Sequence, residues 1–346
     1  MVEKKALMRV TGDHLYIPDP YLGSTLKANA QCYIERQVTH EHVYTNDRGW
    51  RVCNPKQTQN AQPCDIALIG CSWAMGEAVE YEDTFAHHIA NDTGQTLANL
   101  GVGSYSLLQA YRRLEREITF VKPKIVIVSF GHWLIDRCFK TNAMGNVMMR
   151  PIFRRKINAN DKNGGIFVEN PGYAPKWLIE YYTETLRRDG PKSIKAKALY
   201  TLIQLRIKKL HRVFYKDSTH ISFDETSFLQ ARSHVLQYLL DRFDTLAKAH
   251  NTKILFFHMH QYTNFFDRDA GNIEHDSCYF QQCVNNETLF YQPPYMMEAA
   301  LKAHETTLLN QSLVESIHCP DNNHPNEKGH RIIADCILKT LIEKRL

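Results

Sequence analysis

Short apolar runs alternate with amphipathic stretches along much of this chain, and this alternation limits the folds that it can adopt. The apolar runs have the length and branched side chains typical of buried strands: Asp65–Ile69, Thr96–Asn99, Lys124–Ser129 and Thr252–His258. Stretches with helical spacing follow them: 83–91, 107–121, 223–250 and a last helix that Pro325 is expected to open. Strands joined by helices pair in parallel and are covered on both faces, so the sequence predicts a three-layer α/β fold with a parallel sheet.

Two segments depart from the alternation. Residues 1–60 hold short β-prone pieces separated by Pro and Gly, which predicts a β-rich N-terminal extension. Residues 140–222 interrupt the pattern with loop signals and then two helical stretches, at about 175–188 and 193–215. Because this insertion comes right after the loop that follows the strand Lys124–Ser129, we expect it to cover the strand ends as a helical cap. The remaining residues, 61–139 and 223–346, form the predicted core of the α/β fold.

The positive charge of the chain is concentrated in this insertion. The net charge is +5 overall, yet residues 150–216 hold 16 Lys and Arg against 5 Asp and Glu. Such a segment is either a solvated helical face or a surface for an anionic partner, such as a polysaccharide, an acyl carrier protein or a membrane lipid. Nucleic acid is not an expected partner, since no recognition motif accompanies the charge.

Several classes of protein are disfavoured by what the sequence lacks. No apolar run approaches the ~18 residues of a membrane span, so no transmembrane segment is predicted. The first residues have no apolar signal core, which predicts a cytoplasmic protein, with the periplasm left open if a leader precedes them. The 9 cysteines show no paired spacing and are expected to be reduced thiols. His258 and His260 lack an evident third ligand, so neither a metal nor a cofactor is predicted.

Two short motifs carry the chemistry of a serine nucleophile. Ser72 lies in Gly-Cys-Ser-Trp-Ala-Met-Gly, directly after the first buried strand, where the active residues of such sheets are found. Asp321 precedes His324 by three residues near the C-terminus, close enough to share one turn with it. The carboxylate would hold the imidazole in the tautomer that a serine nucleophile needs. His330, further along the expected last helix, is interpreted as a helix residue that contacts the turn.

The motifs resemble those of the SGNH (GDSL-type) hydrolase superfamily. The tail Asp321-Asn-Asn-His-Pro-Asn-Glu-Lys-Gly-His330 matches the D-x-x-H-P-N-x-x-G-H of that family. The first motif matches the family's G-D-S-x-x-x-G at its serine and last glycine, although Cys71 stands in place of the Asp. Asn99-Leu-Gly-Val-Gly-Ser104 resembles the second block with Ser104 at the usual glycine, and the third block, around Gly131, lacks its Asn. The N-terminal segment resembles those of bacterial SGNH proteins linked to surface polysaccharides.

The resemblance implies a three-layer SGNH (flavodoxin-like) fold and a serine esterase that works through a Ser72-His324-Asp321 triad and an acyl-enzyme. The favoured substrate is an O-acyl or O-acetyl carbohydrate ester. The predicted oxyanion donors are Gly101, Gly103, Ser104 and His132, where His132 would replace the missing Asn. The predicted substrate-binding residues are Trp73, Tyr105, Trp133, Arg154 and Arg155. An SGNH-type O-acyltransferase and a non-catalytic binding protein on a degraded SGNH scaffold remain alternatives.

Overall fold

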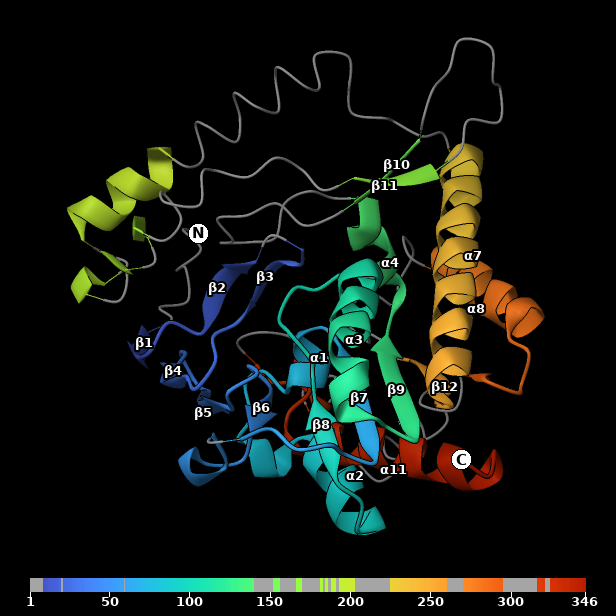
Figure 1. Ribbon diagram of the computed structural model, residues 1–346, viewed down its shortest axis with the longest axis horizontal. Coiled ribbons are helices and arrows are strands. Elements are labelled where there is room, and N and C mark those ends of the chain that lie inside the picture. The colour runs from blue at the N-terminus through green and yellow to red at the C-terminus, as the bar shows by residue number, and fades with distance from the viewer. Residues whose placement is uncertain are drawn as a thin grey trace.

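A nine-stranded sheet forms the centre of the protein (Figure 1). The computed structural model describes the following residues: 9–19, 21–58, 60–139, 152–155, 166–169, 181–182, 184–185, 188–190, 193–202, 225–259, 270–294, 316–320 and 324–346. The strands lie side by side in this order: β1 (Arg9–Gly12), β4 (Gln31–Glu35), β5 (His40–Thr45), β6 (Arg51–Val52), β8 (Leu97–Asn99), β7 (Ile66–Gly70), β9 (Ile125–Phe130), β12 (Lys253–His258) and β13 (Leu289–Gln292).

The sheet has a parallel half and an antiparallel half. Strands β8, β7, β9, β12 and β13 run parallel to one another. The strands of the N-terminal segment pair antiparallel with one another and join the parallel half where β6 pairs with β8. The predicted α/β fold with a parallel sheet is confirmed. The N-terminal strands extend this same sheet, and β2 (Tyr16–Asp19) and β3 (Gly23–Leu26) form a separate hairpin beside it.

Helices cover both faces of the parallel half. On one face α3 (Leu107–Val121) packs against α7 (Glu225–His250), which in turn contacts α8 (Ala270–Cys283). On the other face α2 (Phe85–Thr93) packs against α11 (Glu327–Glu343). The helix α3 begins at its predicted residue because Ser106 caps it, in a reciprocal pair of bonds with Gln109.

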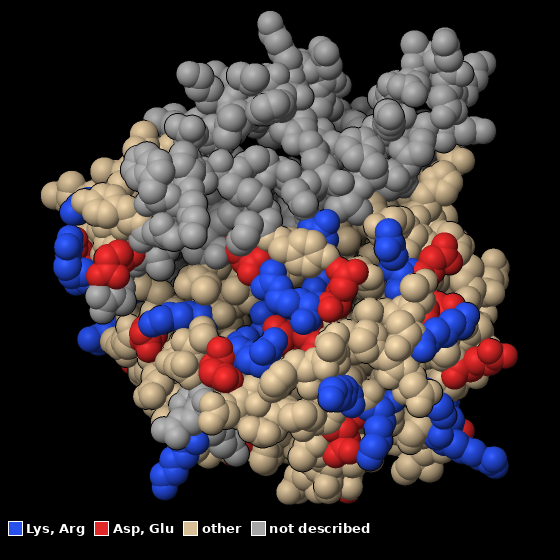
Figure 2. Space-filling model, viewed as in Figure 1, with Lys and Arg blue, Asp and Glu red and all other residues tan. Residues whose placement is uncertain are grey.

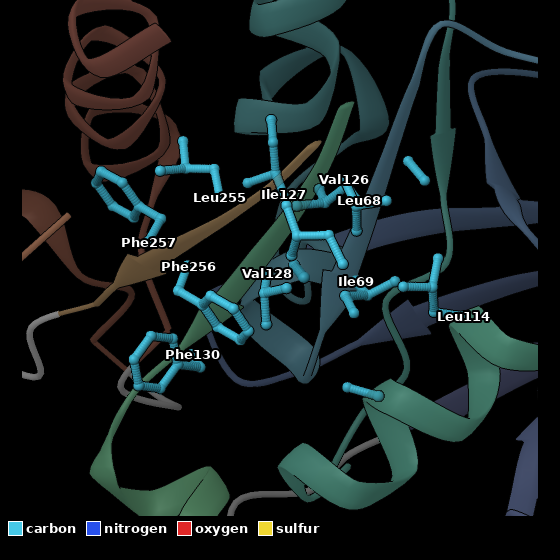
Figure 3. Packing of buried hydrophobic residues seen from close by; sticks show 14 of the residues in the cluster. Leu68, Ile69, Leu114, Val126, Ile127, Val128, Phe130, Leu255, Phe256 and Phe257 are labelled. Atoms are coloured by element: carbon cyan, nitrogen blue, oxygen red, sulfur yellow. The ribbon is translucent and has the colours of Figure 1, made fainter. Parts of the chain in front are cut away.

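Alternation along the central strands fills the core between these layers. Every residue of β7 and of β9 is buried, as expected for strands that are covered on both faces. Figure 3 shows Val128 and Phe256 pointing to one side of the sheet and Ile127 and Leu255 pointing to the other. The parallel register places each of these pairs level across the two strands, so that the large side chains stack in layers.

The last helix begins later than the sequence predicts. Pro325 does not open α11; it forms an antiparallel bridge with His318, and the helix begins at Glu327. The side chain of Asn326 accepts the backbone N–H of Gly329 and so serves as the N-cap. Helical spacing places Ile342 on the inner face beside Leu341, but Ile342 is 78% exposed whereas Leu341 is buried.

Only part of the predicted cap lies within the described residues. The strands β10 (Ile152–Arg155) and β11 (Ile166–Glu169) form an antiparallel hairpin, and residues 194–202 are helical. Phe153 on β10 packs edge-on against Tyr238 of α7, which holds this hairpin against the core. Most residues of the predicted helices lie outside the described ranges, so the cap and its charge stay a prediction. On the described face in Figure 2, Lys and Arg lie among Asp and Glu.

Candidate active site

Ser72 is the first residue of the short helix α1 (Ser72–Met75), at the carboxyl end of β7. The turn between strand and helix depends on Gly70, because a Cβ there would lie 2.5 Å from the carbonyl oxygen of Ser129. After α1 the chain turns back, and the backbone N–H groups of Gly76 and Glu77 both donate to the carbonyl of Ser72, at 2.9 and 3.0 Å. This local wrapping fixes the position of the serine, whose surface is 7% exposed.

His324 reaches Ser72 from the other end of the chain. Its Nε2 lies 2.8 Å from the Oγ of Ser72, although the two residues are 252 positions apart. The backbone holds His324 in place on both sides: its carbonyl accepts the N–H of Cys319, and the N–H of Asn326 donates to Ile317. The structure therefore brings together the two residues that the sequence predicts as nucleophile and base. Asp321 lies outside the described residues, so its role stays a prediction.

The second motif packs directly on the nucleophile helix. The amide of Asn99 donates to the carbonyl of Ala74 at 2.9 Å, and its oxygen accepts the N–H of Gly101 at 3.0 Å. A Cβ on Gly101 would lie 2.4 Å from the backbone nitrogen of Met75, so only glycine permits this approach. The prediction that Gly101 donates to an oxyanion is wrong, because Asn99 already occupies its N–H.

Gly103 and Ser104 remain suitable oxyanion donors. The backbone N–H groups of these two residues make no hydrogen bond within the described part of the chain. Ser104 has a φ of 63°, a left-handed conformation that glycine adopts most easily, which accounts for the glycine usual at this position in SGNH sequences. A Cβ on Gly103 would lie 2.2 Å from the hydroxyl of Tyr16, so the hairpin β2–β3 presses on this loop.

His132, the predicted substitute for the missing Asn, is the first residue of α4 (His132–Asp136) and is buried. Pairing of Gly70 with Ser129 places the end of β9 level with the end of β7. His132 therefore follows β9 just as Ser72 follows β7. Its carbonyl accepts a hydrogen bond from the guanidinium of Arg232, at 3.4 Å. Donation from His132 to an oxyanion stays a prediction.

The predicted substrate-binding aromatics divide into two groups. The rings of Trp73 and Trp133 lie 5.3 Å apart beside the nucleophile, and His318 stacks edge-on against Trp73 at 5.9 Å. Tyr105 is fully buried, and its hydroxyl donates to the carbonyl of Ser24 at 2.7 Å. The prediction that Tyr105 binds substrate is wrong, because it packs the core under the N-terminal hairpin. Nothing is described of the side chains of Arg154 and Arg155, which lie on β10.

A largely buried set of charges, which the sequence analysis missed, surrounds the turn after α1. The guanidinium of Arg36 contacts Glu41 at 2.9 Å and Glu77 at 3.0 Å, and Glu41 also contacts Arg51 at 3.6 Å. We call Arg36, Glu41, Arg51 and Glu77 the charge network. Its last member, Glu77, lies 3.7 Å from the Nε2 of His324. Glu77 directly follows the first motif, but the other members come from the N-terminal segment, where no motif marks them.

Burial and pairing act against each other within the charge network. Burial raises the pKa of Glu41, while Arg51 and Arg36 oppose that rise. Burial would lower the pKa of Arg36, but the charges of Glu41 and Glu77 outweigh it, and the pKa of Arg36 is raised. Arg51 also donates to the carbonyls of Met75, Gly76 and Val79, so the network holds the backbone that carries Glu77.

His330 has a structural role, as the sequence analysis proposes. Its Nδ1 accepts the backbone N–H of Phe85 at 3.2 Å, and its ring stacks on that phenyl ring. Burial, with a smaller effect of Arg51, lowers the pKa of His330 well below its usual value. The imidazole is therefore neutral and joins α11 to α2.

The described residues include no cluster of three or more His, Cys, Asp or Glu that could hold a metal ion. His258 instead shares a hydrogen bond with the hydroxyl of Tyr291 at 2.9 Å, and His260 lies outside the described ranges. Among the helices of the described part, none combines the length and apolar content needed to cross a bilayer.

Comparison with solved structures finds proteins of similar fold. TesA matches with a TM-score of 0.41 and 10% identity over 81% of this chain and 98% of that one. A G-D-S-L family protein from Desulfitobacterium hafniense DCB-2 matches with a TM-score of 0.40 and 11% identity, over 80% of this chain and 98% of that one. A catalytic mutant of Axe2, an acetylxylan esterase from Geobacillus stearothermophilus, matches with a TM-score of 0.39 and 13% identity, over 81% of this chain and 94% of that one.

The chain is thus similar, at low identity and over about 80% of its length, to these solved structures. No family model matches the sequence. No curated protein matches it either. Identities and TM-scores at this level do not carry function from one protein to another, so function is inferred below from the geometry of the site.

Proposed function

We propose that this protein is a serine esterase that hydrolyses carboxylic esters through an acyl-enzyme. Ser72 is the nucleophile, His324 is the general base, and Asp321 orients the imidazole. The observation that carries this proposal is the 2.8 Å contact between the Oγ of Ser72 and the Nε2 of His324. That distance suits proton transfer, and it joins two motifs from opposite ends of the sequence at the carboxyl end of a parallel strand.

The proposed reaction proceeds in two halves. His324 takes the proton of Ser72 through Nε2 while Oγ attacks the ester carbonyl. The negative charge that develops on the carbonyl oxygen is stabilised by backbone N–H groups of Ser72, Gly103 and Ser104, with His132 as a further donor. His324 then gives the proton to the departing alcohol, which leaves an acyl group on Ser72. In the second half, water attacks the acyl group and restores the free serine.

We propose an O-acyl carbohydrate as the ester, because of the motifs and of two indole rings beside the nucleophile. Trp133 is partly exposed and lies against the buried Trp73, so it offers an aromatic face on which a sugar ring can stack. The basic residues of the segment 140–222 are proposed to bind an anionic partner or an anionic part of the substrate.

The test is hydrolysis of p-nitrophenyl acetate by the wild type and by single variants. Ser72→Ala and His324→Ala should each lower kcat by a factor of about 10⁴ or more, and the double variant should be little worse than either. Asp321→Asn should reduce turnover less than His324→Ala does, since the acid orients the base and transfers no proton. Turnover close to that of the wild type in Ser72→Ala would overturn the proposal.

Labelling with a fluorophosphonate separates an enzyme from a binding protein on the same scaffold. The wild type should be labelled at Ser72, and Ser72→Ala should not be. A matched control is Ser233→Ala on α7, because the hydroxyl of Ser233 donates to the carbonyl of Leu229 in its own helix and shares a hydrogen bond with the Nε2 of His275. This variant should be labelled and active like the wild type.

A further inference from the structure

Glu77 faces the nitrogen of His324 at which protons are transferred. Its Oε2 lies 3.7 Å from Nε2, the same nitrogen that lies 2.8 Å from the Oγ of Ser72. The acid that orients the base in a catalytic triad contacts the other ring nitrogen, Nδ1. Glu77 is therefore placed beside the reacting atoms, in a position different from that of the orienting acid.

The position of Glu77 is fixed from two directions. Its backbone N–H donates to the carbonyl of Ser72 at 3.0 Å, so its place relative to the nucleophile is set by the turn after α1. Its Oε1 accepts a hydrogen bond from Arg36 at 3.0 Å, and the side chain of Arg36 is only 7% exposed. The second oxygen of the carboxylate is thereby directed toward His324.

We propose that Glu77 positions the water that hydrolyses the acyl-enzyme, an inference that rests on the proposed esterase function. Once Ser72 carries the acyl group, its Oγ has no proton to share with His324, and Nε2 can accept one from an incoming water. Two acceptors 3.7 Å apart allow one water oxygen to lie within about 2.8 Å of both. The water then donates one proton to Nε2 and the other to the Oε2 of Glu77.

The bonds and protons of this step balance. The water oxygen forms a bond to the acyl carbon, and the proton that it gives to Nε2 passes to the Oγ of Ser72 as the Oγ–carbon bond breaks. The second proton stays on the attacking oxygen throughout and is released later, as the carboxylic acid ionises. Glu77 therefore accepts a hydrogen bond without itself being protonated.

This arrangement favours water over a simple alcohol as the attacking group. An alcohol has one proton on its attacking oxygen, and that proton must go to His324. It has none left for Glu77, whose negative charge would then face the lone pairs of the attacking oxygen. The geometry around Glu77 thus favours hydrolysis over transfer to an alcohol.

The experiment measures how the acyl-enzyme of Glu77→Gln divides between water and methanol. In this variant Arg36 donates to the remaining amide oxygen, so the NH₂ group faces the site and the acceptor for water is lost. With p-nitrophenyl acetate, the burst of p-nitrophenol should keep its rate, while steady-state turnover should fall about 10- to 100-fold. The ratio of methyl acetate to acetate formed should rise about tenfold, a change that a general loss of structure does not produce.

Glu80→Gln serves as the matched control. Glu80 lies three residues further along the chain, and its carboxylate pairs with the ring of His42 at 2.9 Å and accepts the backbone N–H of His42 at 3.1 Å. This variant should keep the wild-type burst, turnover and product ratio. Glu77→Ala should repeat the effect of Glu77→Gln.

Two results would overturn the inference while leaving the proposed function intact. One is a product ratio in Glu77→Gln equal to that of the wild type. The other is an equal loss of burst rate and turnover, which would place Glu77 in acylation or in the fold. Failure of the proposed function is distinct from both, because wild-type turnover would then persist in Ser72→Ala.

Discussion

Replacement of Arg51 by methionine should lower the free energy of unfolding more than any comparable change at a surface ion pair. The side chain of Arg51 is fully buried, and it lies 3.6 Å from the equally buried Glu41. It also donates to the carbonyl of Met75 at 3.0 Å, to that of Val79 at 2.7 Å and to that of Gly76. Methionine fills much of the same volume but offers no donor to any of these groups.

The magnitude follows from the groups left without a partner. Each backbone carbonyl that loses its hydrogen bond in the interior costs about 1–3 kcal/mol. Glu41 keeps Arg36 at 2.9 Å and the N–H of Ala78, also at 2.9 Å, so its charge is only partly uncompensated. Breaking a buried ion pair by removing one partner costs about 3–5 kcal/mol, and the lost carbonyl bonds add to it, so we expect Arg51→Met to cost at least that much.

The assay is urea denaturation followed by circular dichroism. A shift in the midpoint reports a change in stability when the dependence of the unfolding free energy on urea concentration is the same in variant and wild type. Arg331→Met is the matched control, because Arg331 pairs with Asp92 and Asp335 on the surface, where its side chain is 40% exposed. This change should cost about 1 kcal/mol or less. Arg51→Met within about 1 kcal/mol of the wild type would show that the charge network adds little to the stability of the turn after α1.

Two further predictions concern the packing of the site and its response to pH. Gly101→Ala should lower kcat for ester hydrolysis by more, expressed as a free energy, than it lowers the free energy of unfolding. The reason is that a Cβ 2.4 Å from the backbone nitrogen of Met75 must push the loop away from α1. Equal kcat in the variant and the wild type would contradict this. Because the pKa of His330 is lowered in the folded protein, the unfolded state binds a proton more readily than the folded state does. The contribution of His330 to the free energy of unfolding is therefore fully present above the unfolded pKa of 6.5 and is lost as the pH falls below it. The free energy of unfolding should therefore fall between about pH 6.5 and pH 5 more steeply for the wild type than for His330→Gln, whereas equal slopes in urea titrations would refute the role given to His330.

The parallel sheet and the pair of Ser72 and His324 could be predicted because their signals are local. Buried strands such as Ile125–Phe130 are marked by continuous apolar runs, and the two motifs fix residue types within a few positions. The start of α11 was misplaced because Pro325 and Asn326 both favour a helix start. Only the bridge between Pro325 and His318 shows that the cap is Asn326.

The charge network and the burial of Tyr105 could not be predicted from the sequence. Charged residues such as Arg36, Glu41 and Arg51 usually lie on the surface of a protein. Their burial depends on contact with the turn after α1, which lies further along the chain. Tyr105 follows a loop of the candidate site, but the hairpin β2–β3 covers it, and its hydroxyl donates a hydrogen bond to the carbonyl of Ser24 in that hairpin. In both places the outcome is decided by contacts with the N-terminal segment, whose position no motif specifies.

Through the pairing of β6 with β8, the N-terminal strands cover the edge of the parallel half of the sheet. Without them β8 would become an edge strand, with free N–H and C=O groups along a row of largely buried residues. Such an edge is a template for pairing with a second chain. A truncated protein that begins after Val52 should therefore self-associate through β8, because removal of the N-terminal strands exposes the backbone of this strand to a second copy.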